Sequence, residues 1–222
     1  MNSFKHLLYS QFAKIAKAMS SPHRLEILEY LAQREHSVES LSQISGISYA
    51  NCSQHLQQLK AVGLVASRKE GQHVHYSLAN ALVQECFGSL AKIAQHNLAE
   101  VDRLISQHLS AKDDLEPISS EELLQLLKDD LVTLIDVRPA DEYQAGHIAG
   151  AINVTLEELE SFMQQHQAHK EVVAYCRGPY CILSFEAVQR LRKQGIASQR
   201  LKDGFPEWRL AGLPLATAGD KE

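Results

Sequence analysis

The residues best suited to covalent chemistry gather around Cys176, where an apolar run ends in a Gly-Pro turn. The run from Val172 predicts a buried strand, and a helical pattern follows the turn directly. That helix is indicated by apolar residues at helical spacing, namely Leu183, Ala187, Val188 and Leu191. Unpaired amides at a helix start, together with the charge of Arg177, favour a thiolate, so we predict that Cys176 is a nucleophile. A structural cysteine in a strand-to-helix turn is the alternative.

The elements that must position Cys176 alternate between strand and helix patterns. Strands are predicted at residues 131–137, 151–154, 172–176 and 199–202. Helices are predicted after a capping box at residues 119–122, near 141–145, from 155 to about 165, after the Cys176 turn, and before Gly212. This alternation predicts an α/β fold with a parallel sheet, whose ligands bind at the carboxyl ends of the strands. Asp136 and Cys176 both fall at such ends.

The first half of the chain has a different pattern. Helices are predicted from Phe4 to Met19, from Ser21 over Leu31, from Ser37 to Ser45, and from Ser48 to about Val62. Residues 64–78 then change to period two around a polar tip, which predicts a β-hairpin. Helices, a helix-turn-helix and a hairpin in this order predict a mainly α winged helix-turn-helix domain.

The helix from Ser48 offers a polar face that suits the major groove of DNA. Cys52, Leu56 and Leu59 share its other face, which must be buried. Small and amide side chains contact base edges and phosphates, although such a face is also typical of plain solvated surface. The predicted DNA contacts are Ser48, Tyr49, Ala50, Asn51, Ser53, Gln54, Gln57 and Gln58 on the helix, and Arg68, Lys69, Gln72 and His73 at the hairpin.

A long helix is predicted from about Asn80 to His108, with a broad apolar stripe that needs a partner. Together with the first helix it is expected to form a dimer interface, in which Cys86 would be buried. Residues 110–117 are charged and end in a proline, which suits a linker. We therefore predict two domains, residues 1–110 and 117–218.

Residues 18–28 (AMSSPHRLEIL) and 53–65 (SQHLQQLKAVGLV) resemble the ArsR family of winged-helix repressors. The resemblance implies a homodimer that binds double-stranded operator DNA. Ser37 and Glu39 stand where many metal-sensing members carry two thiolates, and Glu29 stands where sulfide-responsive members carry a sensing cysteine. We therefore expect neither that metal site nor that cysteine switch, and no metal or cofactor elsewhere. Cys52 is expected in the core.

Residues 136–153 (DVRPADEYQAGHIAGAIN), 175–178 (YCRG), 203–208 (DGFPEW) and 212–214 (GLP) resemble a single rhodanese domain. The resemblance implies that Cys176 takes a sulfane sulfur and holds it as a persulfide. It also implies that the backbone amides of a substrate-binding loop cradle the outer sulfur, and that the Arg177 side chain attracts anionic donors such as thiosulfate. That loop is Arg177, Gly178, Pro179, Tyr180, Cys181 and Ile182. Asp136, Arg138, Glu142 and His147 are expected to serve mainly as scaffold.

Two positions of this loop decide between related chemistries. Phosphatases and arsenate reductases of this fold need an arginine six residues after the nucleophile, where this chain has Ile182. We therefore set that chemistry aside. Cys181 could close a disulfide or polysulfide with Cys176, but packing in the loop is the favoured role.

Composition limits the remaining classes. The chain has 222 residues and a formal net charge of −5, divided into +3 for residues 1–112 and −8 for residues 113–222. The basic half is the better candidate for a polyanion partner. Four cysteines are too few and too irregular for a secreted disulfide framework, and no signal-peptide or membrane-spanning pattern is present. A cytoplasmic protein is expected.

The sequence thus favours a DNA-binding transcriptional repressor with an attached rhodanese-like sulfurtransferase domain. Two alternatives remain open. The chain could be a thiol redox switch on DNA without sulfurtransferase turnover, or a sulfurtransferase whose winged helix serves only for dimerisation.

Overall fold

The computed structural model describes residues 3–110, 116–165, 170–217 and 219. The chain forms two compact units, residues 1–92 and 93–222, which are described separately. No helix within these described ranges is long and apolar enough to span a membrane. The predicted linker falls mostly on residues 111–115, outside the described part, so the predicted domain limits stay predictions.

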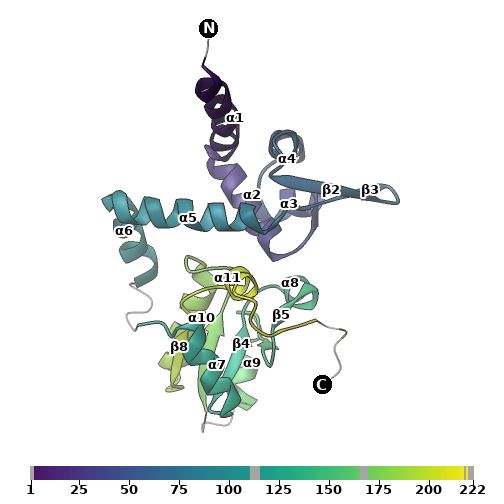
Figure 1. Cartoon of the computed structure of the whole chain (residues 1–222). Helices are drawn as coiled ribbons and strands as arrows, with labels where there is room; N and C mark the ends of the chain where they lie inside the picture. The colour runs from purple at the N-terminus through teal and green to yellow at the C-terminus, as the bar shows by residue number, and fades with distance from the viewer. Residues whose placement is uncertain (1–2, 111–115, 166–169, 218, 220–222) are drawn as a thin grey trace. The chain divides into compact units, whose positions relative to one another are not determined.

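The first unit is a winged helix-turn-helix, as predicted (Figure 1). Its helices are α1 (Phe4–Met19), α2 (Pro22–Gln33), α3 (Val38–Ser45) and α4 (Tyr49–Ala61). The turn between α3 and α4 begins at Gly46, whose φ of 70° caps α3 in the left-handed region. The Ser48 hydroxyl then accepts a hydrogen bond from the amide of Asn51 and starts α4.

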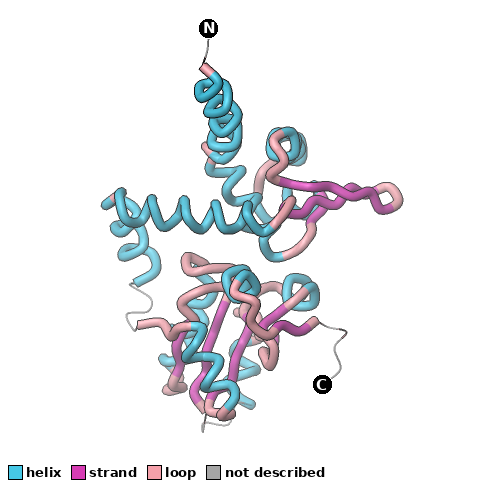
Figure 2. Tube along the Cα trace, in the orientation of Figure 1, coloured by secondary structure: helices cyan, strands magenta, loops and turns pink. Residues whose placement is uncertain are grey.

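An antiparallel sheet completes this unit. Strands β2 (Val65–Glu70) and β3 (His73–Leu78) form the predicted hairpin, which extends as a ribbon to a short loop (Figure 2). The two-residue strand β1 (His36–Ser37) pairs with the other side of β3. The core lies between the helices and the base of the hairpin and contains Ile27, Leu41, Cys52, Leu56 and Leu59, each fully buried.

The predicted helix from Asn80 to His108 is wrong as a single element. The structure has α5 (Ala81–Asn97), α6 (Ala99–Ile105) and a π-helical turn (Ser106–Ser110). Leu98 separates α5 from α6 with an extended backbone, φ −115° and ψ 100°. The apolar spacing continues across this break, which is why the pattern predicted one helix.

The second unit is an α/β domain with a parallel sheet, which confirms the predicted fold class. The sheet order is β6-β4-β7-β8, and every neighbouring pair is parallel. Its strands are β4 (Val132–Asp136), β6 (Ile152–Asn153), β7 (Glu171–Tyr175) and β8 (Ser198–Arg200). Its helices are α7 (Ser120–Lys128), α8 (Ala140–Ala145), α9 (Leu159–Gln165), α10 (Ile182–Lys193) and α11 (Phe205–Leu210). A separate pair, β5 (His147–Ile148) with β9 (Leu215–Ala216), was not predicted.

Two apolar cores lie on opposite faces of this sheet. One contains Leu134, Val173 and Tyr175 and is covered by residues of α7 and α11. The other contains Ile135, Ala174 and Cys176 and is covered by residues of α9 and α10. Because successive side chains of a strand point to opposite faces, Cys176 lies on the α10 side of the sheet.

Candidate functional site

Cys176 lies immediately after β7, in the loop that leads to α10. Its side chain is only 1% exposed, and Cys181 is bonded to it as a disulfide with the two Cα atoms 6.1 Å apart. Cys181 also packs against the core around Cys176, so the structure combines the favoured packing role with the disulfide that was the alternative. Cys181 is also the N-cap residue of α10, so the helix start holds the second sulfur beside the first.

The predicted sulfur cradle is smaller than the whole loop. Pro179 has no amide hydrogen to donate. The amide of Cys181 donates to the carbonyl of Gly178 at 3.1 Å and closes a turn instead. Arg177, Gly178, Tyr180 and Ile182 are left as the amides that could face an outer sulfur on Cys176.

A second loop braces the Cys176 loop, backbone against backbone. A Cβ atom at Gly204 would lie 2.4 Å from the Cα and from the amide nitrogen of Gly178. The next residue, Phe205, donates its amide to the carbonyl of Cys176 at 3.1 Å. Only glycine fits at 204 without moving the loop. The sequence pointed to residues 203–208 only through the rhodanese resemblance. The one local sign that this segment packs closely against another backbone is the glycine directly before the Phe-Pro start of α11.

The Arg177 side chain is held by a carboxylate. Its Nε donates to Glu142 Oε1 and Oε2 at 2.9 and 3.1 Å, and its Nη2 donates to Oε1 at 2.6 Å. Arg177 is 16% exposed and Glu142 only 2%. The negative charge of Glu142 therefore offsets the guanidinium charge, and the expected attraction of thiosulfate by Arg177 is weakened. Glu142 lies on α8 and contacts the Cys176 loop through the Arg177 side chain.

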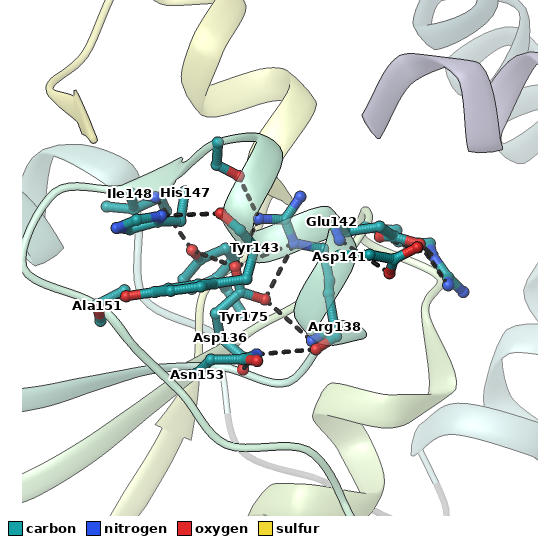
Figure 3. A network of polar contacts seen from close by, with 12 residues as sticks. Asp136, Arg138, Asp141, Glu142, Tyr143, His147, Ile148, Ala151, Asn153 and Tyr175 are labelled. Carbon is teal, nitrogen blue, oxygen red and sulfur yellow. Dashed lines mark hydrogen bonds and ion pairs between the residues drawn. The ribbon is translucent and has the colours of Figure 1, made fainter. Parts of the chain in front are cut away.

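A buried polar network holds the carboxyl ends of β4 and β7 together (Figure 3). Asp136 and Arg138 are fully buried and form an ion pair, with Arg138 Nη2 2.5 Å from Asp136 Oδ2. The Tyr175 hydroxyl donates to the same carboxylate at 2.6 Å and accepts from the amide of Ile148 at 3.0 Å. Burial raises the pKa of Tyr175 well above its ordinary value, and the negative charge of Asp136 is the second cause of this increase. These groups are all paired internally, which suits the predicted scaffold role.

His147 belongs to the same scaffold. Its ring stacks on the ring of Tyr143, with centroids 3.7 Å apart, and its Nδ1 lies 2.9 Å from the Tyr143 carbonyl oxygen (Figure 3). Asn153 donates to the carbonyls of Asp136 and Arg138 at 2.9 Å each. These contacts fix the loop after β4, which carries Glu142 toward Arg177.

The polar face of α4 is exposed where the sequence predicted it. Ser48, Tyr49, Ala50, Asn51 and Gln54 are exposed, and Ser53 is half-buried. Two further amides of this face are engaged inside the unit. Gln57 donates to the Tyr76 hydroxyl at 3.4 Å, and Gln58 accepts from Arg24 at 2.7 Å.

The hairpin tip carries exposed Lys69, Gln72 and His73, as predicted. Arg68 is exposed as well, but its guanidinium lies 2.6 Å from a Glu35 carboxylate oxygen and 2.5 Å from one of Glu70. A phosphate would have to compete with two carboxylates for Arg68. Lys69 is therefore the stronger candidate for a phosphate contact at this tip.

The remaining cysteines differ in exposure. Cys52 is fully buried, as predicted, and burial raises the pKa of its thiol to about 11. Cys86 is exposed in the single chain, with its Sγ 3.8 Å from Met19 Sδ.

A cavity of about 550 Å³ lies between α9 and α10, and it is lined by none of the predicted sulfur-site residues.

Known protein families match both parts of the chain. Residues 21–67 match the model of the bacterial regulatory protein arsR family, and residues 119–211 match the rhodanese-like domain. The HTH-type transcriptional regulator Rv0324 of Mycobacterium tuberculosis is 41% identical over 211 residues, covering 95% of this chain and 92% of its own length. The chain is an ArsR-family transcriptional regulator with a rhodanese-like domain.

Further relatives match one unit of this ArsR-family regulator each. The thiosulfate sulfurtransferase GlpE of Coxiella burnetii is 31% identical over 93 residues, covering 41% of this chain and 85% of GlpE. The crystal structure of NolR from Sinorhizobium fredii is 34% identical and covers 42% of this chain and 93% of NolR, with a TM-score of 0.40.

The regulator uses residues 37 and 39 to begin a helix. Ser37 caps α3 by accepting a hydrogen bond from the amide of Ser40 at 3.2 Å. The Glu39 carboxylate is hydrogen-bonded by its own amide and by the Ser37 hydroxyl, which lowers its pKa. Serine and glutamate are typical of a first helical turn, so these positions have a local structural role.

Proposed function

We propose that this regulator represses transcription by binding operator DNA as a homodimer, and that sulfane sulfur taken up by Cys176 is its effector. The observation that carries the proposal is the placement of Cys176. It ends a strand, precedes the N-terminus of the twelve-residue helix α10 and lies in a loop braced by Gly204 and Phe205. A helix N-terminus and loop amides favour a sulfur anion at this position.

The DNA part of the proposal is supported by the exposed face of α4 and the tip of the hairpin. Dimerisation is supported by an exposed apolar face on α1, where Phe4, Leu8 and Phe12 recur every fourth residue and are 79%, 38% and 58% exposed. A helix with such a face needs a partner in water. A second copy of the chain is the simplest partner for a regulator that reads two half-sites. The cytoplasm is the compartment we expect for an operator-binding protein.

The sulfur part follows from the chemistry of a persulfide. The Cys176 thiolate attacks the outer sulfur of a donor such as thiosulfate, sulfite leaves with the electron pair of the broken bond, and Cys176 keeps the sulfur. Cyanide as acceptor would then give thiocyanate and restore the thiolate. In the disulfide form Cys176 Sγ is bonded to Cys181 Sγ and has no thiolate, so the disulfide must be reduced before Cys176 can react with a donor.

Thiocyanate formation by the reduced full-length protein tests this step. Wild type is expected to turn over, and Cys176→Ser is expected to lose the activity entirely. Cys86→Ser is a matched control, because Cys86 is exposed and lies in the other unit. Equal activity of wild type and Cys176→Ser would contradict a persulfide at Cys176.

The Cys176–Cys181 disulfide also favours a second candidate, a thiol switch that responds to oxidants without sulfur turnover. In that case peroxide would form the disulfide in the reduced protein, and thiosulfate with cyanide would give no thiocyanate. The third possibility, a sulfurtransferase whose winged helix only dimerises, predicts no binding to the promoter of its own gene.

A further inference from the structure

Cys181 has a position that a second sulfur nucleophile would need. It is the N-cap residue of α10, and its Sγ is bonded to that of Cys176 with the Cα atoms 6.1 Å apart. It packs against the same apolar core that buries Cys176. The distance between the Cα atoms lies within the usual range for a disulfide, so the backbone is already suited to bringing the two sulfurs together.

The loop between the two cysteines is held at several points. Gly204 packs against the backbone of Gly178, Phe205 binds the carbonyl of Cys176, and Glu142 holds the side chain of Arg177. The turn from Gly178 to Cys181 is closed by a backbone hydrogen bond of 3.1 Å. The approach of Cys181 to Cys176 is thus imposed by the fold, and a sulfur loaded on Cys176 would be placed next to a second thiol.

We propose that Cys181 is a resolving cysteine, which converts the Cys176 persulfide into the internal disulfide and releases hydrogen sulfide. This inference rests on the proposed persulfide. The Cys181 thiolate attacks Cys176 Sγ and forms the Cys176–Cys181 bond with its electron pair. The bond between Cys176 Sγ and the outer sulfur breaks, and the outer sulfur leaves with that pair as hydrosulfide. The proton lost by Cys181 completes hydrogen sulfide, and the outer sulfur is reduced as Cys181 is oxidised.

The consequence is a change in what the domain produces. Without Cys181 the persulfide would wait for an external acceptor, whereas with Cys181 each sulfur taken up gives one hydrogen sulfide and one disulfide. Return to the thiol form requires a dithiol reductant, which reduces the Cys176–Cys181 disulfide by thiol–disulfide exchange and is itself oxidised to a disulfide. The stable product of sulfane-sulfur uptake is then the Cys176–Cys181 disulfide rather than the Cys176 persulfide.

The sequence allows the two cysteines to be followed separately. Trypsin cleaves after Lys170, Arg177 and Arg190, so Cys176 lies on peptide 171–177 and Cys181 on peptide 178–190. The two peptides stay together after cleavage only if the disulfide joins them. A persulfide instead adds the mass of one sulfur atom to peptide 171–177 alone.

The experiment loads reduced full-length protein with glutathione persulfide in the absence of oxygen, removes the donor, and measures sulfide and tryptic peptides without a reductant. Wild type, Cys181→Ser and Cys176→Ser are compared, and Cys176→Ser gives the sulfide that arises from the donor alone. Serine is a good N-cap residue, so Cys181→Ser should keep the start of α10. Glutathione disulfide in a parallel sample identifies any disulfide formed without sulfur uptake.

Wild type is expected to give joined peptides and one sulfide per chain above the Cys176→Ser level. Cys181→Ser is expected to keep the extra sulfur on peptide 171–177 and to release no sulfide above that level. A stable persulfide on wild type, or equal sulfide release by Cys181→Ser, would overturn the role of Cys181. If Cys181→Ser takes up no sulfur at peptide 171–177, the persulfide itself fails, and the proposed function fails with it.

Discussion

Gly204 and Gly178 lie backbone against backbone, so closely that a Cβ atom at 204 would lie 2.4 Å from the Gly178 Cα. Gly204 has a φ of −108°, which any residue can adopt, so space rather than backbone strain requires glycine there. The contact joins the start of α11 to the loop of Cys176. The shape of the sulfur site therefore depends on a residue 28 positions away from the cysteine.

The Gly204→Ala variant is expected to lower the free energy of unfolding by about 1–3 kcal/mol, because the methyl group forces two backbones apart. Thiocyanate formation should fall with it. Gly178→Ala is the matched control for stability, since a Cβ atom at Gly178 meets nothing within 4 Å. Urea unfolding monitored by the fluorescence of Trp208 measures both. Equal midpoints for Gly204→Ala and wild type would show that the close contact is absent.

The Glu142→Gln variant is expected to raise kcat/KM for thiosulfate by several-fold, up to about tenfold. Removal of the carboxylate charge leaves the Arg177 guanidinium unneutralised, while the amide oxygen still accepts a hydrogen bond from it. Glu157→Gln, an exposed site elsewhere in the domain, controls for the change in net charge. Steady-state thiocyanate assays measure the effect. An unchanged or lower kcat/KM in a folded Glu142→Gln protein would show that Arg177 does not set the affinity for anionic donors.

Iodoacetamide at a pH of about 8.5, near the ordinary thiol pKa, is expected to label Cys52 in the unfolded chain well before it labels Cys52 in the folded protein. Cys52 is fully buried, and burial raises the pKa of its thiol to about 11. As the pH rises, this thiol ionises at a lower pH in the unfolded chain than in the folded protein. Its contribution to stability is therefore complete below about pH 8.5 and is lost as the pH rises toward 11. Mass spectrometry of the labelled peptides checks the order, and rapid labelling of Cys52 in the folded protein would contradict its burial.

The Lys69→Ala variant is expected to weaken binding to all DNA sequences and to reduce the slope of log affinity against log salt by about one. Arg68→Ala should have a smaller effect on that slope, because Glu35 and Glu70 already neutralise the Arg68 guanidinium. Binding titrations at several salt concentrations measure both slopes. A larger loss of slope for Arg68→Ala would mean that Arg68 leaves its carboxylates when DNA binds.

Sequence periodicity predicted those parts of the fold that local patterns determine. The four parallel strands and the winged helix follow from alternating and helical spacing, and Cys52 was placed correctly on a buried face. The pair β5–β9 was missed because strands of two residues have no readable period. The break at Leu98 was missed because the apolar spacing continues across it.

The site was harder to predict because its contacts join distant segments. Glu142 and Arg177 are 35 residues apart, and no local pattern shows that they pair. The same holds for Gly204 against Gly178. The strand-to-helix turn and the resemblance to rhodanese both predicted Cys176 as the nucleophile, and a disulfide with Cys181 was an open alternative. The pairing of Arg177 with Glu142 is seen only in the tertiary structure.

The most direct test of a sulfane-sulfur effector is the affinity of the regulator for its own promoter, compared between reduced and polysulfide-treated protein. Treatment is expected to weaken binding by wild type about tenfold, which corresponds to about 1.4 kcal/mol of coupling between the units. Cys176→Ser is expected to bind equally well before and after treatment. Unchanged affinity of wild type, or an equal loss in Cys176→Ser, would contradict the proposal that sulfur on Cys176 controls DNA binding.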